Sequence, residues 1–419
     1  MSEKSLEQWQ RRIFLSAWIT YFSFYLIRVN FSVAVPGIMQ EFGLTKTALG
    51  GVMTALFSGY AIGQFVNGQI GNHINPRYFI AAGLSVSAII NIAFGLIPGG
   101  IVFLMVLMWG INGFVQSTGW APTVRTISNW FGTEKRTRYS TLLGTSYIAG
   151  SAFSVLLAGF VVSHLGWRYV FIAPALISLG VAVQWFVFGR GSPEEVNSKL
   201  EQKVLEATNE NHEEVGSSPK EVLKYTLSHK GVWIAAFALF GLNIVRYGFL
   251  DWAPTYFFET QAISVSKAAY QSTLFPFAGI LGAVAAGIFS DKLLEHHSST
   301  AGVMLTALFG SIIAFPTLMS LHWALGLTCL TLIGFLSFGP HVLIVSSIPM
   351  DLGTRNGSSA VTGFIDGFGY IGAAITGVVT GWIVDNFGWV NGIYFWAFGA
   401  LIAALMAFLI WRRDCREEA

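Results

Sequence analysis

Long apolar segments recur along the whole chain, and they constrain its fold more than any other feature. Each is about 20 residues or longer, the length that an α-helix needs to cross a bilayer, and short polar breaks separate them. Membrane β-strands would instead alternate in hydrophobicity over about ten residues. We therefore predict an all-α membrane protein of twelve transmembrane helices, near 14–37, 48–71, 77–97, 102–128, 139–163, 168–188, 231–258, 268–290, 300–320, 323–349, 357–385 and 390–411.

The composition supports this fold and excludes several classes of function. The 419 residues are 53% hydrophobic and 11% charged, whereas soluble domains are about 25% charged. A net charge of +2 is too small to indicate a nucleic-acid partner, so the lipid bilayer is the expected environment. The sequence has no P-loop, no GxSxG motif and no cluster with metal-ligand spacing. We expect neither an enzyme nor a bound metal or cofactor.

The positions of lysine and arginine predict the orientation in the membrane. Of the 24 such residues, eighteen fall on the side that holds both termini, three fall on the opposite side and three lie inside predicted spans. Cytoplasmic loops carry the excess of positive charge, so both termini are expected in the cytoplasm. The polar start "MSEKSLEQWQRRIF" then forms a cytoplasmic tail rather than a cleaved signal. We expect a multi-pass protein of a bacterial inner membrane.

The sequence indicates two similar halves. The only long polar stretch, 189–230, divides the spans six and six, so we predict an N-terminal bundle over 1–188, a cytoplasmic linker over 189–230 and a C-terminal bundle over 231–419. "HLGWRYVFIAPALISLG" echoes "NFGWVNGIYFWAFGALI", and Arg28 and Arg246 each lie eight residues before a proline. Simple helix–loop geometry is the alternative explanation for such echoes. Parallel repeats around a central site are typical of transporters, and twelve spans can enclose that site in a monomer.

Arg28 and Arg246 are the residues that most need an explanation. An arginine at the centre of a membrane helix costs roughly 2.5–3.5 kcal/mol on insertion scales. Such a guanidinium binds an anionic substrate, or it pairs with an intramembrane acid such as Asp251 or Asp366. The symmetric spacing favours the first role, with one arginine from each half facing the same anion. Arg125 lies near a helix end, where pairing or snorkelling explains it at least as well as a role in substrate binding.

Four stretches carry a resemblance to a known family. "YLIRVNFSVAVP", "GWAPTVRTISNWF", "VRYGFLDWAPTY" and "GFIDGFGYIGA" occur in this order along nearly the whole chain. They resemble motifs of the major facilitator superfamily, and within it of the organophosphate:inorganic phosphate antiporter family. The resemblance implies that superfamily's fold and a phosphate site built from Arg28 and Arg246. It also assigns to that site Tyr25, one turn before Arg28, and Tyr370 in span eleven.

Two positions depart from the family pattern and a third adds an acid. Gln64 stands in "YAIGQF" where sugar-phosphate carriers commonly have a lysine, and Tyr147 stands where several members have a histidine. We count both as candidate substrate contacts. Asp366 in span eleven is a candidate for proton coupling or for pairing with a cation. His341 is a candidate proton-coupling group or a packing residue.

These features predict a secondary transporter that moves a small organic phosphate or related anion, in exchange for inorganic phosphate. Asp366 and the missing lysine favour a second possibility, a proton-coupled symporter for a hexuronate, a phosphonate or a siderophore. A transporter-like sensor of sugar phosphates is the third.

Overall fold

The computed structural model describes residues 3–197, 226–292, 297–348 and 358–417. Within these ranges the chain is helical and has no strand, and twelve helical segments are long and apolar enough to cross a membrane. The predicted number of spans is therefore confirmed. The predicted linker 189–230 falls largely outside the described residues.

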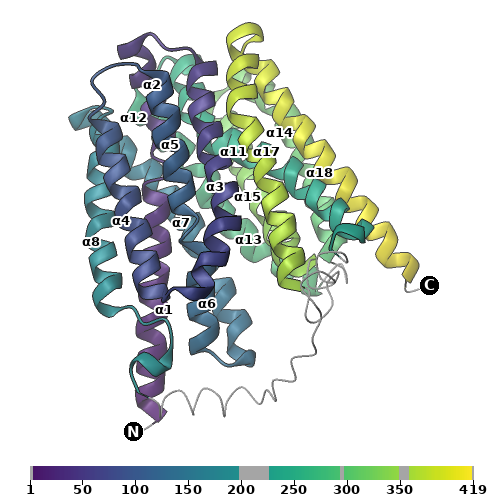
Figure 1. Ribbon diagram of the computed structural model, residues 1–419. Coiled ribbons are helices and arrows are strands. Elements are labelled where there is room, and N and C mark those ends of the chain that lie inside the picture. The colour runs from purple at the N-terminus through teal and green to yellow at the C-terminus, as the bar shows by residue number, and fades with distance from the viewer. Residues whose placement is uncertain (1–2, 198–225, 293–296, 349–357, 418–419) are drawn as a thin grey trace. The chain divides into compact units, whose positions relative to one another are not determined.

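The first six spans run from α1 to α8 (Figure 1). Two of them are built from two helices each: α1 with α2 forms the first span, and α5 with α6 forms the fourth. A short 3-10 helix, η1 (Pro193–Glu195), follows α8. The helices are α1 (Glu3–Leu26), α2 (Phe31–Phe42), α3 (Lys46–His73), α4 (Pro76–Gly95), α5 (Val102–Gln116), α6 (Trp120–Trp130), α7 (Thr133–Leu165) and α8 (Tyr169–Phe188).

The last six spans run from α11 to α18. The eighth combines α12 with α13, and the tenth ends in a π-helical turn, η2 (Leu343–Ser347). The helices are α11 (Lys230–Gln261), α12 (Val265–Ser272), α13 (Leu274–Lys292), α14 (His297–Leu321), α15 (Trp323–Val342), α17 (Ser358–Phe387) and α18 (Trp389–Glu417).

The chain divides into two compact units. The first comprises residues 1–37 and 58–214, and the second comprises 38–57 and 215–419. The units differ from the predicted halves at residues 38–57, which pack with the second unit. There Asp385 of α17 accepts hydrogen bonds from the backbone N–H groups of Lys46 and Thr47, at the start of α3.

The repeat that the sequence indicated has a structural counterpart at the turn before the last span of each half. Gly166 and Gly388 have φ angles of 85° and 81°, a region of backbone conformation that favours glycine. Each ends a helix and is followed by a tryptophan, in "HLGW" and "NFGW". The same turn therefore separates spans five and six and spans eleven and twelve.

Candidate substrate site

The first span is broken at Arg28. α1 ends at Leu26 and α2 begins at Phe31, so residues 27–30 form a turn within the membrane span. The backbone N–H groups of Arg28 and Val29 both reach back to the carbonyl of Tyr25, at 3.3 and 3.2 Å. Such a break frees carbonyl groups that a bilayer leaves without a partner, so irregular backbone at this depth needs donors from neighbouring helices.

Side chains from four other helices supply those donors. The Nε2 of Gln116 lies 3.3 and 3.2 Å from the carbonyl oxygens of Phe24 and Ile27. Asn91 of α4 also donates to Ile27, at 3.1 Å. Ser154 of α7 donates to Leu26 at 3.0 Å, and Ser178 of α8 donates to Ser23 at 3.3 Å. The break is thus satisfied by buried polar groups and is part of the fold of the first unit.

Arg28 is held by an amide and two aromatic rings. Its side chain is 4% exposed, and its Nε donates to the Oε1 of Gln116 at 2.5 Å. The guanidinium carbon lies 4.5 Å from the ring centres of both Tyr25 and Tyr60. Cation–π contacts of this kind stabilise a desolvated guanidinium. The rings and the amide therefore fix its orientation without themselves carrying a negative charge.

The structure brings two of the other predicted residues to Arg28. Tyr25 packs on it directly, and the ring of Tyr147 on α7 lies 5.6 Å from that of Tyr25. α1 and α7 approach so closely here that a Cβ added to Gly150 would come within 2.8 Å of the Cβ of Tyr25. Gln64 is half-buried on α3, one turn after Tyr60, which places it on the helix face that Arg28 contacts.

Sequence reasoning missed the polar residues that hold Arg28 in place. Gln116 also donates to Ser87 at 3.1 Å, and Ser87 donates to Asn112 at 2.6 Å. Ser87 and Asn91 are four residues apart, as are Asn112 and Gln116. Polar residues at i and i+4 in an otherwise apolar span share one helix face, and this spacing is the signal that would have identified them.

Arg246 lies in the middle of α11, beside an amide and two aromatic rings. It is also 4% exposed, and its Nη1 donates to the Oδ1 of Asn243, one turn earlier, at 3.0 Å. The guanidinium carbon lies 4.7 Å from the ring centre of Phe338 and 5.6 Å from that of Tyr247. In the described part of the chain no ion pair joins Arg246 to an acid, and its Nε has no hydrogen-bond partner. Of the two acids predicted as alternative partners, Asp251 and Asp366, Asp251 is not paired with Arg246 there.

Other predicted residues lie near Arg246 on α15 and α17. The ring of Tyr370 lies 6.2 Å from that of Tyr247 and 6.3 Å from that of Phe57. His341 is 9% exposed and is close enough for the charge of Arg246 to act on it. Asp366 is half-buried on α17, one turn before Tyr370. Tyr370 therefore joins the surroundings of Arg246 through Tyr247.

Arg125 has a contact that fits a helix-end role. It lies in α6, and its Nη1 donates to the carbonyl of Gly71 near the end of α3, at 2.8 Å. Lysine and arginine commonly satisfy the last carbonyls of a helix in this way. We therefore leave Arg125 out of the candidate site.

Comparison with known proteins identifies the family. The sequence profile of the Major Facilitator Superfamily matches residues 14–377, most of the chain. The chain belongs to this superfamily. A member of it is a membrane transport protein rather than an enzyme.

Curated relatives place the chain more narrowly. The glycerol-3-phosphate transporter of Bacillus subtilis is 30% identical over 97% of this chain and 93% of its own. A probable hexose phosphate transport protein of Chlamydia muridarum is 32% identical over 97% and 92%. A membrane sensor protein of Escherichia coli is 28% identical over 95% and 91%. These relatives are organophosphate:inorganic phosphate antiporter family members, as the sequence motifs predicted, and the chain belongs with them.

A solved structure supports the superfamily's fold. A bacterial homologue of the human lysosomal transporter Spinster, in an inward-facing, occupied conformation, matches with a TM-score of 0.78. The match covers 96% of this chain and 97% of that one at 13% identity. The predicted fold class is therefore confirmed.

Proposed function

We propose that this facilitator carries a small organic phosphate across the membrane in exchange for inorganic phosphate, and that Arg28 and Arg246 bind the phosphoryl group. The observation that carries the proposal is the setting of Arg246. It is a buried cation, oriented by a neutral amide, with no acid paired to it in the described chain. Keeping a charge in such a place is costly, and an anionic substrate that neutralises it in each cycle explains why it is kept.

Phosphate chemistry suits both arginines. A phosphate monoester carries between one and two negative charges near neutral pH and offers strong acceptor oxygens. Guanidinium matches two of those oxygens with a rigid fork of donors and stays charged when buried. The equal spacing of Arg28 and Arg246 from the prolines that follow supports equivalent depths in the two halves. An empty site with two cations would resist closure, and a loaded one would not, which favours exchange over uniport.

Tyr25 and Tyr147 complete the site on the side of Arg28, and Tyr370 does so on the side of Arg246. Gln64 stands where sugar-phosphate carriers commonly have a lysine, so the proposed site has one cation fewer to contact the organic part of the substrate. We therefore propose a substrate whose organic part is recognised by hydroxyl and amide groups, carried by a monomer with both termini in the cytoplasm of a bacterial inner membrane.

The test is uptake of labelled inorganic phosphate into proteoliposomes that are either preloaded with phosphate or left empty. We expect uptake that requires internal phosphate and falls to background in Arg28→Ala and Arg246→Ala. Arg138→Ala, which removes an exposed cation of α7, is the matched control and should exchange normally. Uptake by wild type that is equally fast into empty vesicles would contradict exchange, and normal uptake by either arginine variant would exclude that arginine from the site.

Two other functions each have a specific observation in their favour. The half-buried Asp366, with Gln64 replacing a cation, favours proton-coupled symport, in which an imposed proton gradient drives uptake and Asp366→Asn abolishes it. The similarity to a membrane sensor protein favours signalling, in which the purified protein binds phosphate esters without net flux.

A further inference from the structure

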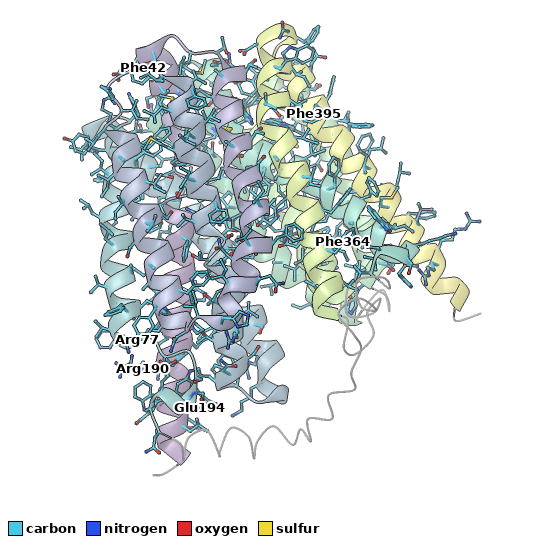
Figure 2. The ribbon with its side chains drawn as sticks, viewed as in Figure 1. Phe42, Arg77, Arg190, Glu194, Phe364 and Phe395 are labelled. Carbon is cyan, nitrogen blue, oxygen red and sulfur yellow. The ribbon has the colours of Figure 1, made fainter. Side chains whose placement is uncertain are left out.

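Three arginines meet at the end of the first unit that holds the N-terminus. Arg12 belongs to α1, Arg77 to the first turn of α4, and Arg190 lies two residues beyond the end of α8. Figure 2 shows Arg77 and Arg190 close together there, with Glu194 just beyond them. None of the three takes part in the candidate substrate site.

Aromatic side chains hold two of these guanidinium groups. The Arg12 guanidinium carbon lies 4.8 Å from the ring centres of both Trp9 and Phe188. That of Arg77 lies 5.1 Å from the ring centre of Phe186, and its Nε donates to the Phe186 carbonyl at 2.5 Å. Arginine stacked on aromatic rings beside the end of a membrane helix is the composition expected at the lipid–water interface.

Two neighbouring arginines act on Arg190, and one acid opposes them. Burial and the charge of Arg77 lower the pKa of Arg190; Arg12 acts in the same direction and Glu195 opposes it. The Oε1 of Glu195 already accepts hydrogen bonds from the side chain of Asn75 and the backbone N–H of Gly191, at 2.9 and 2.8 Å. Arg12 and Arg77 therefore repel Arg190, and Glu195 compensates that repulsion only in part.

The apolar surroundings indicate what kind of anion would bind. Tyr78, Phe186 and Phe188 are 52%, 46% and 43% exposed, on α4 and α8 beside the arginines. A free phosphate ion gains nothing from exposed rings, whereas a lipid presents acyl chains to them and its phosphate to the cations. Basic clusters beside membrane helices bind anionic head groups for this reason.

We propose that Arg12, Arg77 and Arg190, with the rings of Trp9, Phe186 and Phe188, form a binding site for the head group of an anionic phospholipid. The lipid occupies the leaflet at the N-terminal end of the first unit, which is the cytoplasmic leaflet in the orientation that the sequence predicts. Its phosphate reduces the repulsion among the three cations and fastens α1, α4 and α8 together. This site is independent of the proposed transport activity.

The test compares thermal unfolding of the detergent-purified full chain in phosphatidylglycerol, in phosphatidylcholine and in inorganic phosphate. We expect phosphatidylglycerol to raise the melting temperature of wild type by several degrees above the value in phosphatidylcholine. Arg12→Gln should lose at least half of that difference, because it removes one of the three cations that bind the head group. Arg12 is exposed, so its replacement leaves the buried packing intact. Arg190→Gln is the second variant and should behave in the same way.

Arg138→Gln is the matched control, since it removes an exposed arginine of the same unit outside the cluster, and it should keep the full difference. An equal loss in Arg12→Gln and Arg138→Gln would overturn the proposal, because the lipid effect would then follow net charge alone. Stabilisation by inorganic phosphate that disappears in Arg12→Gln would also overturn it, in favour of a small-anion site. No lipid-dependent difference in wild type would exclude the site.

Discussion

The Nε of Arg28 donates to the Oε1 of Gln116 at 2.5 Å, so an amide orients this edge of the guanidinium. Arg246 repeats the relationship with Asn243. An amide oxygen and a carboxylate can both orient a guanidinium, but the carboxylate binds it more strongly and also cancels its charge. A site that must attract an anion therefore benefits from the amide, and this difference can be tested.

Replacing Asn243 by an acid should weaken phosphate binding more than removing its side chain does. Asn243→Asp keeps the acceptor and adds a charge that competes with phosphate, so we expect at least about tenfold weaker binding, equivalent to about 1.4 kcal/mol. Asn243→Ala only loosens Arg246 and should weaken binding less. Phosphate titration of the melting temperature measures both, with Asn391→Asp on the exposed face of α18 as the control for added charge. If Asn243 only supports the fold, the order of the two variants reverses. The new ion pair with Arg246 would then stabilise Asn243→Asp, and this variant would bind phosphate better than Asn243→Ala.

The broken first span should depend on its side-chain donors. Ser154 is fully buried and donates to the Leu26 carbonyl. Ser154→Ala leaves that carbonyl without this donor, and interhelical hydrogen bonds in membranes contribute about 0.6 kcal/mol on average and up to about 1.7. We expect a loss of unfolding free energy in that range, measured by denaturant titration. Ser163→Ala, at an exposed site on the same helix that bonds only within its own turn, should change stability by less than about 0.5 kcal/mol.

Asp385 should stabilise the start of α3 through hydrogen bonds more than through charge. Its Oδ2 lies 2.7 Å from both the backbone N and the Oγ1 of Thr47, in the manner of a helix cap. Loss of a cap costs about 0.5–2 kcal/mol, so Asp385→Ala should lower stability by that amount, while Asp385→Asn retains most of it. Glu259→Gln breaks the 3.0 Å ion pair with Lys46, and its amide oxygen can still accept the hydrogen bond that Trp389 donates to Glu259. Such ion pairs contribute about 0–1 kcal/mol. A larger loss in Glu259→Gln than in Asp385→Ala would show that charge dominates.

Glycine at the crossing of α11 and α18 should tolerate no side chain. A Cβ on Gly241 would overlap the carbonyl oxygen of Gly399, which is rigid backbone. Gly241→Ala should therefore cost about 1–3 kcal/mol, as overpacking usually does, in the same unfolding measurement. Gly287→Ala on α13 meets open space and should be neutral or slightly stabilising, since alanine favours a helix. Equal stability of the two variants would mean that the helices separate at little cost.

The sequence by itself determined the number of spans and the internal repeat, and it marked Arg28 and Arg246 as charges within spans. Those features depend on local chemistry, because length and hydropathy decide which segments enter a bilayer, and the repeat shows in spacings such as Arg28 to Pro36 and Arg246 to Pro254. The turns at Gly166 and Gly388 also follow from residues that adjoin in sequence. Resemblance to the family added Tyr25, which the structure places against Arg28.

Only the tertiary structure decided where the first span breaks and how differently the two arginines are held. Nothing in "YLIRVNFS" marks a break, since its freed carbonyls are satisfied by Asn91, Gln116 and Ser154 from other helices. Arg28 lies among polar groups and Arg246 lies against Phe338, although each arginine precedes a proline by the same number of residues. Hydrogen bonds and ring contacts between residues about 60 to 130 positions apart arise only when helices pack, so no local pattern predicts them.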